Sequence, residues 1–233
     1  MGIEKGTGIV LRARKSAESD LVVTWFSEAW GKRAAVAKRA RRLESELGAV
    51  FEPLNVVEVI FYARSRVDLV SQGTLLDGHR GLKGDLPRVS AALAVAHLLD
   101  RLLASHQPEE TAYALLGELL SVLEQGAVKP ETAGLAAAIK LLALLGHRPT
   151  LTRCAGCGRE GGPYVFLIGR GGLLCPSCQP GERHEVSLGL ARSLDLLIRL
   201  PLGRAGVLSL TDEESALAWT AIEEGTQHLA TGP

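Results

Sequence analysis

The chain has 233 residues, with 26 basic and 26 acidic side chains and an apolar fraction of 46%. This composition is that of a globular protein, and the length is sufficient for one large domain or two small ones. The neutral net charge says nothing about partners, but the charge distribution does, because residues 1–80 carry 13 Lys and Arg against 10 Asp and Glu. The basic amino end therefore suits an acidic partner.

Several classes of protein are excluded by the cysteines and the apolar runs. The four cysteines are clustered in pairs, whereas a secreted disulfide protein spreads them. No apolar segment of a signal peptide follows a charged start. The apolar run Leu135–Leu145 is interrupted by Lys140 and is too short to cross a bilayer. We expect a soluble cytoplasmic protein that does not bind a membrane.

The first third of the chain predicts a small β domain. Four short segments are rich in β-branched and aromatic residues, and turn-forming residues separate them. The four predicted strands are Gly8–Arg14, Asp20–Ser27, Asn55–Ala63 and Val67–Leu76. Several strands without long helices between them indicate a barrel or a sandwich.

A basic segment, Gly31–Arg42, lies among these strands and holds six cations and no acid. Its composition favours a helix over Lys32–Leu47, whereas its position favours a strand that presents Lys32 and Lys38 on one face. Either geometry concentrates charge that suits a phosphate backbone, although a solvated charged face is the alternative. The candidate phosphate contacts are Lys32, Arg33, Lys38, Arg39, Arg41 and Arg42, with Arg12, Arg14 and Lys15 as weaker candidates.

Three aromatic residues near this segment, Trp25, Phe26 and Trp30, are candidate platforms for base stacking. The alternative is that they fill the barrel core. We favour the core for at least two of the three, because alternate residues of each strand must fill a small barrel.

After residue 84 the pattern changes to five Ala- and Leu-rich helices that would pack on one another. Each predicted helix opens with a start signal: an N-cap residue, a proline, or the Thr-x-x-Glu spacing of a capping box. The opening residues are Asp85, Pro108, Pro130, Ser187 and Thr211.

The four cysteines, Cys154, Cys157, Cys175 and Cys178, form two C-x-x-C pairs separated by 17 residues, which is the spacing of an all-cysteine zinc site. The segments Tyr164–Ile168 and "GLLC" predict a hairpin between the pairs. Four protein sulfurs fill the shell of the metal, so one structural zinc per chain is expected. We also expect the insert to have little apolar surface of its own, so that zinc would fold it.

No catalytic site is predicted, so the chain is not expected to be an enzyme. "GCGREG" matches a dinucleotide fingerprint only formally, because it follows no strand and opens no helix. Two acidic clusters, Glu109/Glu110 and Asp212–Glu214, fall at helix starts, where capping explains them. A zinc hydrolase or nuclease, and a zinc-ribbon factor of transcription or translation, stay as alternatives.

The order and spacing of these motifs resemble the RecO family of bacterial recombination mediators over nearly the whole chain. The resemblance rests on "ESDLVVTWFSEAWGKRAAVAKRARRLES", on "RGLKGDL", and on "IKLLALLGHRPTLTRCAGCG" followed by "GGLLCPSC". One departure is Arg39, where the family commonly has glycine.

The resemblance implies an α+β architecture, with an OB-fold β-barrel at residues 1–79 that binds DNA. An all-α helical domain at 80–233 would carry the four-cysteine insert at 151–180. It also implies a DNA repair and recombination mediator that binds ssDNA and dsDNA, anneals complementary strands and works in the nucleoid.

The implied partners are RecR and the C-terminal tail of single-stranded DNA-binding protein, with RecA loaded indirectly and RecF as a further candidate. Because that tail is acidic and apolar, it should bind a groove near a cation of the helical domain, for which Lys140 and Arg148 are candidates.

Overall fold

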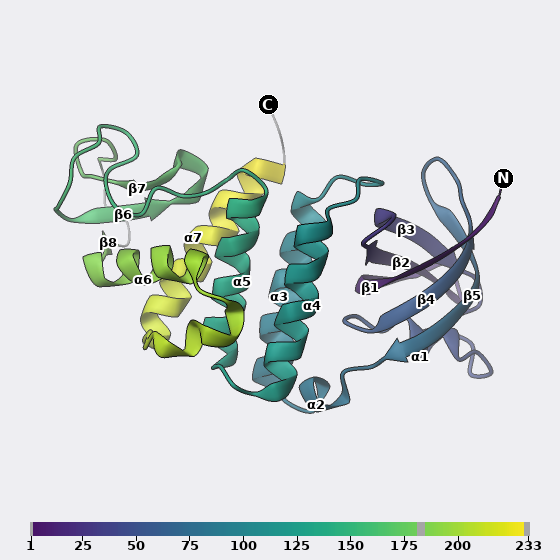
Figure 1. Ribbon diagram of the computed structural model, residues 1–233. Helices are drawn as coiled ribbons and strands as arrows, with labels where there is room; N and C mark the ends of the chain where they lie inside the picture. Colours follow the sequence, from purple (N-terminus) through teal and green to yellow (C-terminus); the bar gives the residue numbers. More distant parts are fainter. Residues whose placement is uncertain (1, 181–184, 231–233) are drawn as a thin grey trace. The chain divides into compact units, whose positions relative to one another are not determined.

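The computed structural model describes residues 2–180 and 185–230. The chain forms two compact units, residues 1–117 and 118–233. The boundary falls inside helix α4 (Glu110–Gln125), so this helix contributes its first half to unit 1 and its second half to unit 2 (Figure 1). Each unit is described separately below.

The amino-terminal part of unit 1 is a closed five-stranded barrel with strand order β1-β2-β3-β5-β4. All neighbouring pairs are antiparallel except β3 and β5, which run parallel and are joined through only two rows, Ala35 with Asp68 and Val36 with Leu69. Of the barrel and the sandwich that the strand pattern allows, the barrel is therefore present, and it is the OB-like barrel that the family resemblance implies. Its strands are β1 (Ile3–Ser16), β2 (Asp20–Ser27), β3 (Gly31–Ala37), β4 (Val56–Tyr62) and β5 (Asp68–Asp77).

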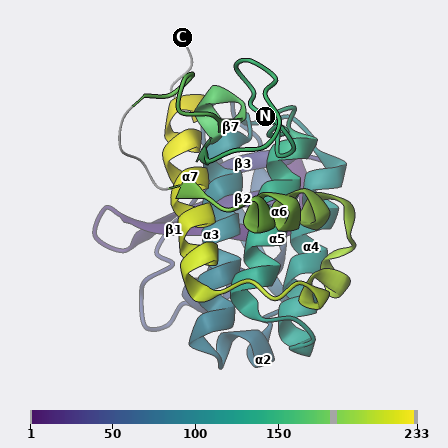
Figure 2. The same cartoon turned by 90° about the vertical axis from the view of Figure 1, so that its left-hand side faces the viewer.

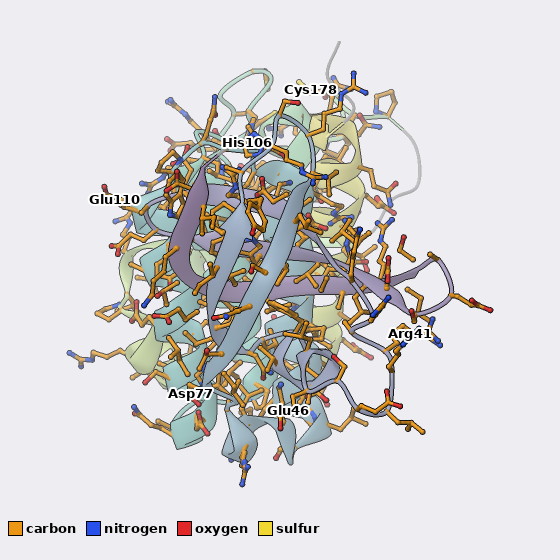
Figure 3. All side chains as sticks on the ribbon, turned by 90° about the vertical axis from the view of Figure 1, so that its right-hand side faces the viewer. Arg41, Glu46, Asp77, His106, Glu110 and Cys178 are labelled. Atoms are coloured by element: carbon orange, nitrogen blue, oxygen red, sulfur yellow. The ribbon has the colours of Figure 1, made fainter. Side chains whose placement is uncertain are left out.

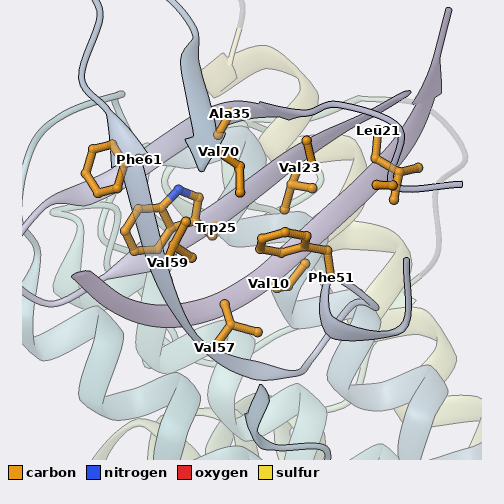
Figure 4. Close-up of a cluster of buried hydrophobic side chains, with 12 residues drawn as sticks. Val10, Leu21, Val23, Trp25, Ala35, Phe51, Val57, Val59, Phe61 and Val70 are labelled. Atoms are coloured by element: carbon orange, nitrogen blue, oxygen red, sulfur yellow. The ribbon is translucent and has the colours of Figure 1, made fainter. Parts of the chain in front are cut away.

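The barrel core is built around Trp25, which is fully buried and meets Phe61 edge to face with 5.5 Å between ring centroids (Figure 4). A glycine at position 8 makes room for this indole, because a Cβ there would lie 2.6 Å from the Trp25 ring and 2.4 Å from the Phe26 carbonyl oxygen. Larger residues at position 8 would therefore displace β1 from β2.

The basic segment begins as strand β3, and the helix alternative is wrong. Burial alternates along β3, with Arg33, Ala35 and Ala37 facing the barrel interior and Lys32 on the outer face. Alanine, lysine and arginine favour helices intrinsically, but pairing with β2 from Leu21↔Ala37 to Ser27↔Gly31 overrides that preference.

Unit 1 also contains two single-turn helices, α1 (Leu47–Val50) and α2 (Arg80–Lys83), and the long helix α3 (Leu86–Leu102). Helix α3 contacts strand β1. As predicted, Asp85 caps α3, and its side chain accepts a hydrogen bond from the Arg88 backbone N–H at 3.1 Å.

Unit 2 is organised around α5 (Pro130–Leu144), which is apolar on all sides and is buried almost continuously from Thr132 to Leu142. It is contacted by α6 (Leu188–Arg199), by the 3-10 segment η2 (Leu202–Val207) and by α7 (Asp212–Ala230) (Figure 2). A helix that is apolar all round needs such cover on every side.

The predicted starts of α6 and α7 are confirmed by their hydrogen bonds. The Ser187 hydroxyl accepts from the Leu190 N–H at 2.9 Å. Thr211 and Glu214 form a reciprocal capping box, with both side-chain-to-backbone distances at 3.1 Å. These signals are local, which is why the sequence locates them well.

The cysteine segment forms a small sheet with strand order β7-β6-β8. The predicted hairpin is present as β6 (Tyr164–Leu167) and β7 (Gly172–Leu174), joined through the 3-10 turn η1 (Ile168–Arg170), and β8 (Glu185–Val186) adds a third strand. The expectation of little apolar surface is wrong: Tyr164, Phe166 and Leu173 are buried.

This sheet also packs on helix α7. A Cβ at Gly225 of α7 would lie 2.6 Å from Ile168, so the small residue allows the close approach. Within the described part of the chain, no helix is long and apolar enough to cross a membrane.

Candidate nucleic-acid interface and metal centre

Six exposed cations gather at one end of the barrel, and we call this set, Arg14, Lys15, Lys38, Arg39, Arg41 and Arg42, the cationic rim. Strand register explains the clustering. Lys15 pairs with Leu21, and Leu21 pairs with Ala37, the last residue of β3. Neighbouring strands lie about 4.8 Å apart, so the end of β1 lies roughly 10 Å from the end of β3.

Hydrogen bonds fix the loop that carries most of the rim. The Arg39 N–H donates to Asp20 Oδ1 at 2.8 Å, and the Arg41 N–H donates to the Ser19 carbonyl at 2.9 Å. The β1–β2 turn therefore positions residues 38–42. The Arg41 guanidinium donates to the Glu18 carbonyl at 3.2 Å, so this side chain lies beside the β1–β2 turn (Figure 3).

Acidic side chains are also present near the rim, chiefly Glu18, Asp20 and Glu44. Asp20 is half-buried and accepts a backbone hydrogen bond, so its carboxylate orders the loop. Glu46 on the same loop is also exposed, so six exposed cations stand against four acids and the local charge stays positive.

Two other candidate phosphate contacts, Lys32 and Arg12, form ion pairs within unit 1. Asp100 of α3 binds the Lys32 ammonium at 3.6 Å and the Arg12 guanidinium at 3.0 Å. The Lys32 ammonium also donates to the Asp100 carbonyl. The Lys32 side chain is only 12% exposed, so its charge anchors α3 to the barrel and is not offered to a phosphate.

Arg33 is buried within the barrel and forms a bidentate ion pair with Asp68 of β5. The Arg33 Nε lies 2.6 Å from Asp68 Oδ2, and a terminal nitrogen lies 2.8 Å from Oδ1. The guanidinium also lies over the rings of Trp30 and Phe61, at 5.7 and 5.2 Å from their centroids. This arrangement leaves the charge of Arg33 no access to a nucleic acid.

The three aromatic candidates are largely withdrawn from the surface. Trp25 and Phe26 are fully buried, and Phe26 packs against Tyr113 with 5.6 Å between ring centroids. Trp30 is half-buried and lies edge to face with Phe61 at 5.8 Å. The interpretation that at least two of them belong to the core agrees with this burial.

The second candidate site is the cluster of Cys154, Cys157, Cys175 and Cys178, whose sulfurs all lie within 4.8 Å of one another. The Cys157 and Cys175 sulfurs are 3.7 Å apart. A tetrahedral metal with bonds of about 2.3 Å to sulfur needs sulfur–sulfur distances of about 3.8 Å, so the four thiols fit such an ion.

Backbone donors prepare the cluster for negative charge. The Cys175 N–H donates to the Cys154 sulfur at 3.3 Å, and this bond is the largest of several hydrogen bonds that together lower the pKa of the Cys154 thiol to about 6. Hydrogen bonding with the Cys157 side chain, the largest contribution, raises the pKa of Cys178 to about 12. Four sulfurs this close cannot all be thiolates without a bound cation, since like charges oppose further ionisation.

Comparison with known proteins identifies the family. A family model described as Recombination protein O N terminal matches residues 1–79, and one described as Recombination protein O C terminal matches residues 83–228. The chain belongs to the RecO family.

Individual relatives agree with this assignment. A DNA repair protein RecO from Symbiobacterium thermophilum is 32% identical, over 93% of this chain and 88% of the relative. A protein of the same name from Anaeromyxobacter sp. strain K is 36% identical over 85% of this chain and 79% of its own length. A third, from Desulforamulus reducens, is 31% identical over 96% and 90%.

The backbone at Arg39 gives a physical reason why glycine, which the resemblance places here in the RecO family, suits this position. Its φ is 56°, in the left-handed region that glycine adopts without a steric cost. An arginine there costs about 1 kcal/mol, but it adds a side chain to the cationic rim.

The two residues predicted to contact a protein tail differ in availability. The Lys140 ammonium donates to the Ile198 carbonyl at 2.8 Å, at the carboxyl end of α6. Burial lowers the pKa of Lys140, and the nearby Glu118 partly opposes this. Arg148 is 54% exposed and lies 3.7 Å from Asp195, which also binds Arg199 at 2.5 Å.

Sequence reasoning missed two residues that restrict the candidate interface, Asp68 and Asp100. They neutralise three of the nine candidate cations and thereby limit the rim to the others. One signal was present: if Gly31–Ala37 is a strand, Arg33 shares a face with Ala35 and Ala37, and a cation on an apolar face requires an acid.

Proposed function

We propose that this chain acts in DNA repair and recombination as a mediator that binds single- and double-stranded DNA and anneals complementary strands. The observation that carries the proposal is the cationic rim on a five-stranded barrel, in a chain that RecO family models match almost throughout. Barrels of this type bind strands through basic grooves.

The proposed domains are a DNA-binding barrel at 1–79 and a helical domain at 80–233 with a metal-binding insert at 151–180. The ranges of the two family models, 1–79 and 83–228, support this division. Residues 80–117 pack in the same compact unit as the barrel, and the ion pairs of Asp100 anchor α3 to it.

Annealing would follow from the charge of the rim. Two complementary strands repel each other through their phosphates, and six exposed cations at one end of a barrel lower that repulsion when both strands bind there. No bond is made or broken, so the proposed activity needs no catalytic residue.

The proposed cofactor is one zinc ion bound by the four cysteine sulfurs. A shell of four sulfurs leaves no position for water or substrate, so the ion would stabilise the insert and not activate a reaction. Thiolate ligands select zinc over magnesium or calcium, which prefer oxygen.

The proposed partners are RecR and single-stranded DNA-binding protein, with RecA loaded indirectly onto the coated strand, and the place of action is the nucleoid in the cytoplasm. For the acidic tail of single-stranded DNA-binding protein, Arg148 is the stronger contact because it is exposed, whereas Lys140 binds the end of α6.

The rim assignment predicts a large effect of charge reversal. In a double variant Arg41→Glu, Arg42→Glu, affinity for a fluorescent oligonucleotide should fall at least about 100-fold at low salt. The slope of log affinity against log salt should decrease by about 1.4, since each lost contact with a single strand contributes about 0.7. Fluorescence anisotropy measures both.

The matched control is Arg64→Glu, Arg66→Glu, which reverses two exposed cations in the β4–β5 loop. That loop lies by the amino end of β1, because Ile3 pairs with Tyr62, whereas the rim lies by its carboxyl end. If the control weakens binding as much as the rim variant does, the rim is not the binding site.

The function itself is tested by annealing. Complementary strands coated with single-stranded DNA-binding protein should anneal faster when the chain is added, and the Arg41→Glu, Arg42→Glu variant should not accelerate them. The same assay is repeated with single-stranded DNA-binding protein that lacks its C-terminal tail. Acceleration that persists without the tail depends on contact with DNA, and acceleration that is lost depends on contact with the tail. No acceleration by the unaltered chain would contradict the proposal.

A further inference from the structure

The loop that carries the cationic rim is held at both ends by the barrel. Ala40 is 1% exposed and belongs to the barrel core, and Leu47 packs against the same core from the far end of the loop. The Arg41 N–H is bonded to the Ser19 carbonyl, as described above. Residues 41–46 are therefore presented outward on a fixed base.

Leu43 lies at the corner of this loop. The Ser45 N–H donates to the Arg42 carbonyl at 3.0 Å, which closes a turn with Leu43 and Glu44 at its two central positions. Turn positions favour Gly, Pro, Asn, Asp and Ser, although the commonest turn type accepts most residues. Here the loop carries leucine.

The exposure of Leu43 is extreme. The Leu43 side chain has a relative accessibility of 104%, which is the highest value for a large hydrophobic residue in the described part of the chain. The next highest value is 76%, at Leu86. Covering a fully exposed leucine with a ligand removes apolar surface from water, which makes binding more favourable. The side chain is therefore available for an apolar contact that no described residue of unit 1 supplies.

The immediate neighbours of Leu43 restrict what that contact can be. Arg41 and Arg42 precede it, and the exposed Glu44 follows it. Over the whole loop, the exposed cations Lys38, Arg39, Arg41 and Arg42 outnumber the exposed acids Glu44 and Glu46 by four to two. A strand held through its phosphates by these cations brings its bases within reach of the corner. Apolar side chains, leucine included, insert between or against bases without reading their sequence.

We propose that Leu43 is a base-contacting residue: it lies against the face of a nucleobase in the strand whose phosphates the cationic rim holds. This inference rests on the proposed function. The contact is independent of sequence, because leucine offers no hydrogen bond to a base edge. It favours strands with unstacked bases, since a paired and stacked base has its faces covered.

The test compares two fluorescent probes of equal length, oligo-dT and an oligomer with an abasic site at every position. Leu43→Ala should weaken binding to oligo-dT about 5- to 20-fold, corresponding to the loss of one apolar contact. It should leave binding to the abasic oligomer, and the salt slope on both probes, unchanged. Leu43→Phe should tighten oligo-dT binding alone, because a ring stacks on a base.

Leu86→Ala is the matched control, since it removes an exposed leucine outside the rim. If Leu43→Ala binds oligo-dT as tightly as the unaltered chain, while Arg41→Glu, Arg42→Glu binds weakly, the inference fails and the proposed function stands. An equal loss on both probes also overturns it, because the effect is then not on base contact. If the unaltered chain binds neither probe, the proposed function fails as well.

Discussion

An Asp68→Asn variant is expected to lose about 3–5 kcal/mol of the free energy of unfolding of the barrel. The Asp68 side chain is fully buried, and its partner Arg33 is 9% exposed. The amide keeps the shape of the carboxylate, and its oxygen can still accept from the Arg64 N–H, which lies 2.9 Å from Asp68 Oδ1. The guanidinium would then be a buried cation without a counter-charge.

The position of this pair in the barrel increases its importance. Strands β3 and β5 share only two ladder rows, and Arg33 and Asp68 join these strands through two further hydrogen bonds. Losing the pair should therefore open the barrel between β3 and β5. The rim lies beyond the end of β3, so opening there would also disorder residues 38–42.

The measurement is urea unfolding followed by tryptophan fluorescence in a Trp219→Phe background. Trp25 and Trp30 then report on the barrel alone, because Trp219 belongs to α7. The matched control is Glu58→Gln, the same chemical change in the surface pair with Lys5, whose side chains are 30% and 63% exposed. It should cost less than about 1 kcal/mol.

A second variant distinguishes the effect of an unpaired buried charge on stability from the effect of lost packing. The double variant Arg33→Met, Asp68→Asn removes the cation as well, so it should be more stable than Asp68→Asn alone. Equal stability of Asp68→Asn and Glu58→Gln would show that the pair does not hold the barrel closed.

The features that could be predicted from the sequence are those formed by residues close together in the chain. The starts of α3, α6 and α7 were predicted because Asp85, Ser187 and Thr211 bond to residues three positions away. The cysteine site was equally predictable, since each C-x-x-C pair is a local turn and the hairpin between the pairs joins them.

The basic segment was harder because its interactions are distant in sequence. Arg33 and Asp68 are 35 positions apart, and Lys32 and Asp100 are 68 positions apart. Composition cannot reveal which acid neutralises which cation when β3 could also be a helix. Once the strand is known, its alternation separates the inward Arg33 from the exposed cations beyond Ala37.

Loss of the proposed zinc is the other change expected to have a large effect. Cys154→Ser should destabilise unit 2 by on the order of 4 kcal/mol, because loss of a metal site is among the few single changes of this size. The Cys154 sulfur is buried and accepts a hydrogen bond from the Cys175 N–H. A serine there would remove one sulfur ligand of the proposed zinc and weaken the hydrogen bond of this buried amide.

The β6–β7 hairpin should survive this change in part, since Tyr164, Phe166 and Leu173 are buried in the insert and Ile168 packs on Gly225 of α7. We therefore expect the two cysteine turns to unfold first. The Cys175 amide donates to the Cys154 sulfur of the other turn, and the Cys178 amide donates to the Cys175 carbonyl. Hydrogen exchange should show lost protection at these two amides before protection is lost along α7.

The matched control for the metal prediction is Ser177→Ala, which alters an exposed residue between two ligands without removing a sulfur. It should keep one zinc per chain by elemental analysis, whereas Cys154→Ser and chelator-treated protein should not. Affinity for oligo-dT per folded molecule should change less than threefold in all three, since the rim belongs to unit 1. A folded Cys175→Ser variant that fails to bind DNA would contradict a purely structural metal and would give the insert a direct part in the interface.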